Sequence, residues 1–163
     1  LQVQALRERQ LDALVLDARS LPPASDLRVE SLHEMRGAFM CRRGHPLARR
    51  RAVSFDELAR YPIASTPLSD EIARILTERY GPRAHPDQCV GLRCEEISSL
   101  IDTARHSDAV LLAVRAAAPD LVELPLKPAL NATARFALVT LAARSEAPTL
   151  KILRQLMDER MRD

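Results

Sequence analysis

The residues from 41 to 64 constrain the fold more than any other part of the chain. An apolar run ends there in a turn at Pro46, which fixes its own φ and disfavours helix at the residue before it. Ser54 and Glu57 have the spacing of a capping box, which predicts a short helix starting after Ser54. Pro62 ends that helix, and a new apolar run follows. This stretch therefore predicts a compact crossing made of a strand end, a turn, a short helix and a new strand.

Short apolar runs and helical patterns alternate along the rest of the chain. Beyond the crossing, we expect helices ending near Gln10 and over 70–80, 95–105 and 148–161, and strands or extended segments over 11–16, 27–32, 38–41, 63–64, 88–92, 109–113, 121–126 and 136–141. Alternation of this kind is typical of α/β folds with parallel strands. The sequence thus predicts an α/β protein.

Composition excludes several kinds of protein. The chain has 163 residues, of which 47% are apolar, enough for a real core, so disorder is not expected. Its net charge of +2 comes from 24 basic and 22 acidic residues, far from the bias of a surface that binds nucleic acid throughout. With 3% aromatic residues and no Trp, a site of stacked rings is not expected either.

The cysteine content and the hydropathy of the sequence indicate the cellular compartment in which the protein works. Three cysteines, Cys41, Cys89 and Cys94, make an odd set without a disulfide framework, which fits a reducing cytoplasm. The sequence holds no run of 18 apolar residues and no signal-peptide pattern, so we expect a cytoplasmic protein with no membrane partner. Because the chain opens inside a helical pattern, we also expect it to be a piece of a longer protein.

Five segments, in this order and spacing, resemble the effector-binding domain of LysR-type transcriptional regulators. They are QLDALVL at 10–16, the crossing at 41–64 with GHPLA and V-S-x-x-x-L-x-x-Y-P, EEISSLI at 95–101, the extended run at 122–126 and the closing strand and helix at 136–161. One departure is the stretch 106–113, which has neither the glycines nor the proline that the family often carries there.

The resemblance implies an architecture. It is α/β, with two Rossmann-like lobes joined by two crossover strands as in type 2 periplasmic binding proteins. Lobe I would comprise residues 1–42 and 127–163, and lobe II residues 43–126. The family's first strand and most of its first helix would be missing from this chain.

The resemblance also implies a function. A small metabolite would bind in the cleft between the lobes, and DNA would be bound through an N-terminal helix-turn-helix domain that is not in this chain. The regulator would be a homodimer or homotetramer, and it would not be an enzyme. A free-standing solute-binding protein of the same fold is the alternative.

Two segments of the expected lobe II are candidates for binding the ligand. Ser65, Thr66 and Ser69 form a polar loop before a helix N-terminus, where free N–H groups favour anions. Cys94 and Glu95 open the next helix and would face the same cleft. Alternatively, Ser69 only caps its helix, and Cys94 is a small buried hydrophobe.

In the expected lobe I, Arg19 and Ser20 follow the first strand, where the family often contacts its effector. A guanidinium suits a carboxylate through two parallel hydrogen bonds, so the expected ligand is a small carboxylate. The alternative is a solvated loop arginine.

Other chemistry has little support in the sequence. His85, Cys89 and Cys94 do not have the spacing of a common zinc site, so no metal is expected. A redox switch between Cys89 and Cys94 stays open, as in peroxide-sensing relatives of the family. The four glycines are too scattered for a nucleotide-binding or nucleophile motif, so neither a cofactor nor an enzyme activity is expected.

Overall fold

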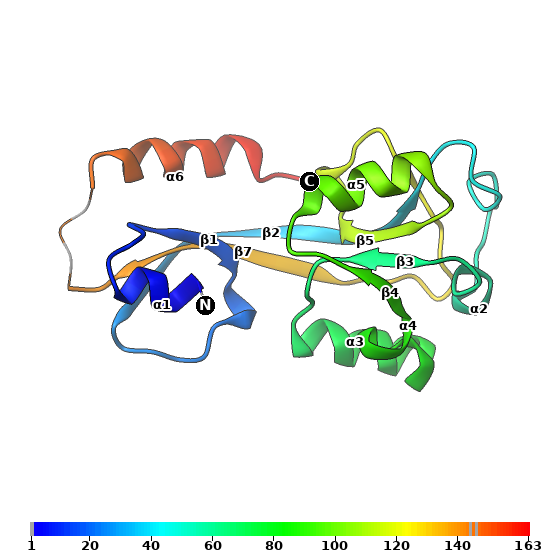
Figure 1. Cartoon of the computed structure of the whole chain (residues 1–163), viewed down its shortest axis with the longest axis horizontal. Coiled ribbons are helices and arrows are strands. Elements are labelled where there is room, and N and C mark those ends of the chain that lie inside the picture. The colour runs from blue at the N-terminus through cyan, green and yellow to red at the C-terminus, as the bar shows by residue number, and fades with distance from the viewer. Residues whose placement is uncertain (1, 144, 146) are drawn as a thin grey trace. The chain divides into compact units, whose positions relative to one another are not determined.

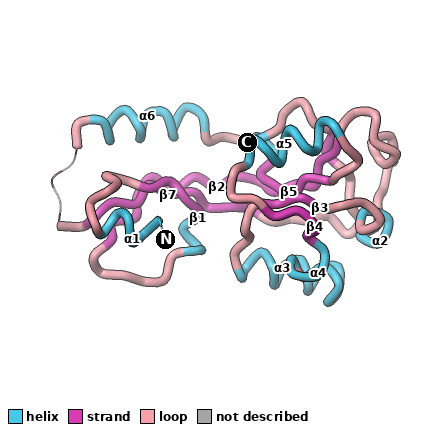
Figure 2. The backbone as a smooth tube through the Cα atoms, in the orientation of Figure 1, coloured by secondary structure: helices cyan, strands magenta, loops and turns pink. Residues whose placement is uncertain are grey.

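The computed structural model describes residues 2–143, 145 and 147–163, so Leu1, the first residue of the expected first helix, lies outside it (Figures 1 and 2). The helices are α1 Gln2–Arg7, α2 Phe55–Leu58, α3 Asp70–Tyr80, α4 Pro86–Cys89, α5 Ile97–His106 and α6 Thr149–Arg160, with 3-10 turns η1 Ala18–Ser20, η2 Pro82–Ala84 and η3 Arg115–Ala117. The strands are β1 Leu14–Asp17, β2 Leu27–Cys41, β3 Ile63–Ser65, β4 Val90–Arg93, β5 Val110–Val114, β6 Val122–Glu123 and β7 Thr133–Leu141.

The predicted α/β class is confirmed, but the strands are not all parallel. Strand β3 pairs parallel with β4 and β5, whereas β1 pairs antiparallel with β7, and β2 antiparallel with β5 and β6. The expectation of parallel lobes was therefore wrong for part of the sheet. The reason is that an apolar strand pattern specifies which residues are buried and not the direction of the neighbouring strand. Over the described residues, no helix is both long enough and apolar enough to cross a membrane.

The chain divides into two compact units, and it passes between them twice. Unit 1 contains residues 1–35 and 134–163, and unit 2 contains residues 36–133. The strand order is β1-β7-β2 in unit 1 and β2-β5-β3-β4 in unit 2, where β6 also pairs with β2. Strands β2 and β7 therefore have residues in both units.

Strand β2 is a single strand of 15 residues, although the sequence predicted two strands at 27–32 and 38–41. Polar residues separate the two apolar runs, yet no proline interrupts the extended backbone. At Gly37, where the polar stretch ends, the amide donates to the carbonyl oxygen of Ala132 at 2.8 Å, so the backbone is hydrogen-bonded before the second apolar run begins. A Cβ atom at Gly37 would lie 3.2 Å from that same oxygen, which explains why glycine suits this position.

The sheet of unit 2 is covered on both faces. One face packs against Ile72 and Leu76 of α3, through Phe39, Ile63, Val110 and Leu112. The other face packs against Leu100, Ile101 and Ala104 of α5, through Ala38, Met40, Ala64 and Leu111. Figure 1 shows α3 and α5 on opposite sides of this sheet. Burial of these apolar faces is the main stabilising contribution to the unit.

The predicted capping box before α2 is confirmed. The Ser54 hydroxyl accepts a hydrogen bond from the Glu57 amide (3.2 Å), and the Glu57 carboxylate accepts one from the Ser54 amide (2.9 Å). Val53 and Leu58, which flank the box at the positions of a hydrophobic staple, are both fully buried in the same apolar cluster. The cap is expected to contribute about 1 kcal/mol to stability. These local signals fix where the chain re-enters the sheet as β3.

The strand predicted over 88–92 begins later than expected. Pro86 occupies the first turn of α4, and the His85 ring nitrogen Nδ1 accepts a hydrogen bond from the Asp87 amide at 3.3 Å. Proline is favoured at the start of a helix, so residues 86–89 form one helical turn and β4 begins only at Val90.

In unit 1, helix α1 ends in a Schellman motif. The Gln10 amide donates to the Ala5 carbonyl (2.9 Å), and the Arg9 amide donates to the Leu6 carbonyl (3.1 Å). This places Arg9 in the left-handed conformation, with φ of 60°. Glycine is the usual residue there, and a side chain with a Cβ atom costs roughly 1–2 kcal/mol in this conformation. Leu6 then packs with Leu14 and Val139 in the core of unit 1.

Candidate functional site

The connections of unit 2 define a point where a ligand can approach the sheet. Strand β3 lies between β4 and β5, which both run parallel to it. The chain leaves β3 for α3 on one face of the sheet, and leaves β4 for α5 on the other. The two connections therefore diverge from the carboxyl ends of β3 and β4. This is the position at which α/β sheets commonly bind ligands.

Four of the predicted site residues meet at this point. In the strand register Ser65 pairs with Arg93, and the Cys94 amide donates to the Ser65 carbonyl oxygen at 3.4 Å. Thr66 and Glu95 are the residues that follow each strand end. Two segments some thirty residues apart in the sequence are thus brought side by side.

The polar side chains of the first segment have different environments. The Ser65 side chain is fully buried, and its hydroxyl donates to the Thr66 carbonyl at 2.9 Å. The Ser69 hydroxyl accepts the Ile72 amide at 3.4 Å, so the capping role considered for this residue is present. The Thr66 side chain is partly exposed, and its hydroxyl makes no hydrogen bond to a described residue. Thr66 therefore offers a ligand a hydroxyl that has no other partner among the described residues.

The second segment precedes α5. Sequence reasoning began this helix at Glu95, but α5 begins at Ile97. Cys94 is half-buried and its sulfur accepts the Glu96 amide at 3.4 Å, while Glu95 is exposed. Glu96 makes no side-chain capping bond to the helix, because its carboxylate accepts the Ser99 hydroxyl instead.

Among the residues that the structure describes, the first-turn amides of α5 therefore have no side-chain acceptor. The sequence analysis singled out Cys94 and Glu95 in this segment but not these amides. The signal for them would have been the absence of Ser, Thr, Asp or Asn at the residue before Ile97.

Arg19 and Ser20 belong to unit 1, in η1 at the end of β1. The Arg19 amide and its Nε atom both donate to Asp17 Oδ1, at 3.1 and 3.3 Å, and the arginine side chain is 14% exposed. The Ser20 hydroxyl donates to the Asp17 carbonyl at 2.6 Å. Asp17 thus orients both residues, and a carboxylate ligand would compete with Asp17 for the Arg19 guanidinium.

The cysteines have distinct surroundings. Cys89 packs with the α3 side of the unit 2 sheet, and its thiol donates to the Ala84 carbonyl (3.4 Å), whereas Cys94 packs with the α5 side. The two thiols stand at opposite ends of β4 and against opposite faces, so joining them would require β4 to rearrange. Burial raises the pKa of Cys89 and raises that of Cys41 to about 11. Among the described residues, no cluster of His, Cys, Asp and Glu could hold a metal ion.

Known proteins are similar to this chain in sequence and in fold. The model of the LysR substrate binding domain matches residues 1–162. The SDS degradation transcriptional activation protein of Pseudomonas sp. (strain ATCC 19151) is 31% identical, with 94% of this chain and 52% of that protein aligned. The chain therefore spans about half the length of this curated relative.

Two solved structures show the same fold at low identity. HinK, a LysR family transcriptional regulator from Pseudomonas aeruginosa, superposes with a TM-score of 0.66 at 16% identity, over 98% of this chain and 55% of that one. The effector binding domain of QuiR in complex with shikimate superposes with a TM-score of 0.63 at 12% identity, over 94% of this chain and 73% of that one. The match over residues 1–162, with which the fold agrees, shows that the chain belongs to the LysR substrate-binding domain family.

Proposed function

We propose that this chain is the ligand-sensing domain of a bacterial LysR-type transcriptional regulator, with units 1 and 2 acting as its lobes I and II. A small effector would bind in the cleft that the family resemblance implies. DNA would be bound by a helix-turn-helix domain outside this chain, in a cytoplasmic homodimer or homotetramer. Sensing requires that the effector bind one arrangement of the domain more tightly than another. The observation that carries this proposal is the meeting of the β3 and β4 ends at a switch point.

The proposed effector is a small carboxylate. From unit 2, the Thr66 hydroxyl and the uncapped amides of α5 would contact it, next to Ser65, Ser69, Cys94 and Glu95. From unit 1, Arg19 and Ser20 would contribute, with the guanidinium oriented by Asp17. Backbone amides at a helix start and a guanidinium both favour an anion. The shikimate complex of the QuiR domain supports the same chemical class, because shikimate is itself a carboxylate.

Calorimetric titration of the domain would test this proposal. The panel would hold organic acids, neutral sugars and hexyl sulfate, the last because the Pseudomonas relative is named for SDS degradation. We expect organic acids to bind. Binding of sugars alone would contradict an anionic effector, and binding of hexyl sulfate alone would exclude a carboxylate.

A pair of threonine variants would test the position of the site. Thr66→Val removes the available hydroxyl while keeping the shape of the side chain, and we expect it to weaken effector binding about tenfold. Thr77→Val removes a hydroxyl from within α3, where it donates to the Ala73 carbonyl (2.8 Å), and should leave binding unchanged. Equal affinities for the two variants would exclude the β3–β4 edge as the binding site.

A further inference from the structure

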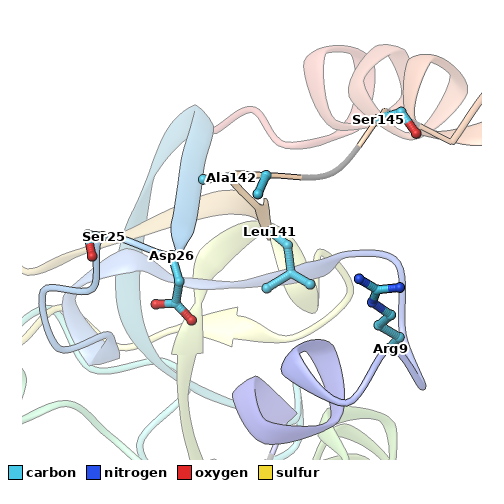
Figure 3. A pocket seen from close by; sticks show the side chains of 7 residues that line it. Arg9, Ser25, Asp26, Leu141, Ala142 and Ser145 are labelled. Carbon is cyan, nitrogen blue, oxygen red and sulfur yellow. The ribbon is translucent and has the colours of Figure 1, made fainter.

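A cavity lies within unit 1, and none of the site residues described in the preceding subsections lines it. Its walls come from the end of α1, the turn before β2 and the end of β7 (Figure 3). The volume is about 450 Å³, within the range of small-molecule sites. Arg9, Ser25, Asp26, Leu141 and Ser145 line it, so its walls combine one cation, one carboxylate, two hydroxyls and an apolar side chain.

The carboxylate in this cavity is already neutralised. Arg7 donates to both oxygens of Asp26, from Nε at 2.7 Å and from Nη2 at 3.2 Å. This contact holds the pKa of Asp26 below its ordinary value. The Asp26 backbone carbonyl accepts the Ala142 amide at 2.9 Å, so the turn is also fixed to the segment after β7. The side of the cavity opposite Arg9 is therefore held in place by contacts within the protein, without a ligand.

Arg9 is the cation that lines the cavity, and its charge is not used to neutralise Asp26. Its side chain is exposed and makes no hydrogen bond or ion pair with a described residue. It also stands at the left-handed position of the Schellman motif, where glycine would be more favourable. Strained backbone conformations of non-glycine residues concentrate at ligand sites. The motif carries the guanidinium to the edge of the cavity, as Figure 3 shows.

We propose that this cavity binds a small organic anion, with its carboxylate on Arg9 and a short apolar body against Leu141. The bidentate fork of the guanidinium suits a carboxylate. Ala142 and Ala143 extend the apolar wall and leave room for a short chain. The site is independent of the one at the β3–β4 edge and takes a ligand whether or not that edge does.

Amide NMR spectra of the isotope-labelled protein, titrated with hexanoate, test this directly. We expect resonances of Arg9, Asp26 and Ala142 to shift together and saturate. Hexanamide, which has the same shape without the charge, should bind about tenfold more weakly. If the cavity resonances stay unchanged, or if the amide binds as tightly as the acid, the proposal is overturned. Shifts confined to Thr66, Cys94 and Glu95 would report the other site and would also overturn it.

Arg9→Gly separates binding from folding. Because glycine relieves the left-handed backbone, this variant should melt at the same temperature as the parent or higher, while hexanoate binds about tenfold more weakly. Arg83→Gln removes one exposed positive charge from unit 2 and serves as the control, with binding unchanged. Undiminished hexanoate binding by Arg9→Gly would overturn the role of this arginine.

Discussion

The backbone amide of Cys94 donates to the carbonyl oxygen of Ser65, and this bond joins the two strand ends at the proposed effector site. Replacing Cys94 by proline removes the donor, whereas alanine keeps it and removes only the thiol. We expect Cys94→Pro to be at least about 1 kcal/mol less stable than Cys94→Ala, the usual contribution of such a bond. Urea unfolding followed by circular dichroism measures the difference, and equal midpoints for the two variants would show that the bond contributes nothing.

Two glycines in strands of unit 2 should respond oppositely to alanine. At Gly37 the added methyl group would lie 3.2 Å from the Ala132 oxygen, which cannot retreat because it accepts the Gly37 amide. Gly37→Ala should therefore cost about 1 kcal/mol. Gly91 has open space around it, and Gly91→Ala should be neutral or stabilising by about 0.5 kcal/mol. Thermal melting of both variants would decide, and a stabilised Gly37→Ala would contradict the tight approach.

Cysteine alkylation should follow burial. Cys41 is fully buried and its pKa is raised to about 11, so little thiolate forms near neutral pH. Iodoacetamide should modify Cys94 first and Cys89 more slowly, since burial raises the pKa of Cys89 as well. Cys41 should react only when urea unfolds the protein. Mass spectrometry of time points gives the order, and alkylation of native Cys41 at the rate of Cys94 would refute it.

Tyr80 should make stability fall at alkaline pH. Burial raises its pKa from an ordinary value of 10.0 to about 12, and its hydroxyl donates to the Pro128 carbonyl at 2.9 Å. Because the unfolded chain loses this proton first, the stabilisation is complete below pH 10 and disappears as the pH rises toward 12.

The variant Tyr80→Phe separates this titration from other alkaline effects. It should lose about 1 kcal/mol at neutral pH with the hydrogen bond, and should show a smaller decline in stability above pH 10. Tyr61→Phe leaves Tyr80 in place and should retain the full decline. Urea midpoints measured across this pH range provide the comparison, and identical declines in all three proteins would rule out Tyr80 as the cause.

Local signals in the sequence predicted local structure well. Ser54 with Glu57, and Ser69 before an acidic first turn, specified where α2 and α3 begin, because capping bonds form between residues three positions apart. The apolar pattern misjudged β2 and the start of β4. Pairing between Gly37 and Ala132, and the helical turn at Pro86, override the apolar pattern at those places.

The candidate site was only partly predictable. The loops at 66–69 and 94–95 were found from their position before expected helices, but their contact depends on the pairing of Ser65 with Arg93. For the same reason, the sequence could not predict which polar side chains already have a hydrogen-bond partner within the protein. The Ser65 hydroxyl is used by the Thr66 carbonyl, and Arg19 by Asp17, because these contacts depend on backbone geometry.

Strand β2 contributes to the cores of both units, with Met35 the last residue of one and Arg36 the first of the other. A fluctuation that opens this strand near the boundary would remove β2 residues from the packing of both units at the same time. We expect such an opening to lower the protection from hydrogen exchange of β2 residues on both sides of this boundary. The chain should accordingly resist being cut into two separately folding fragments.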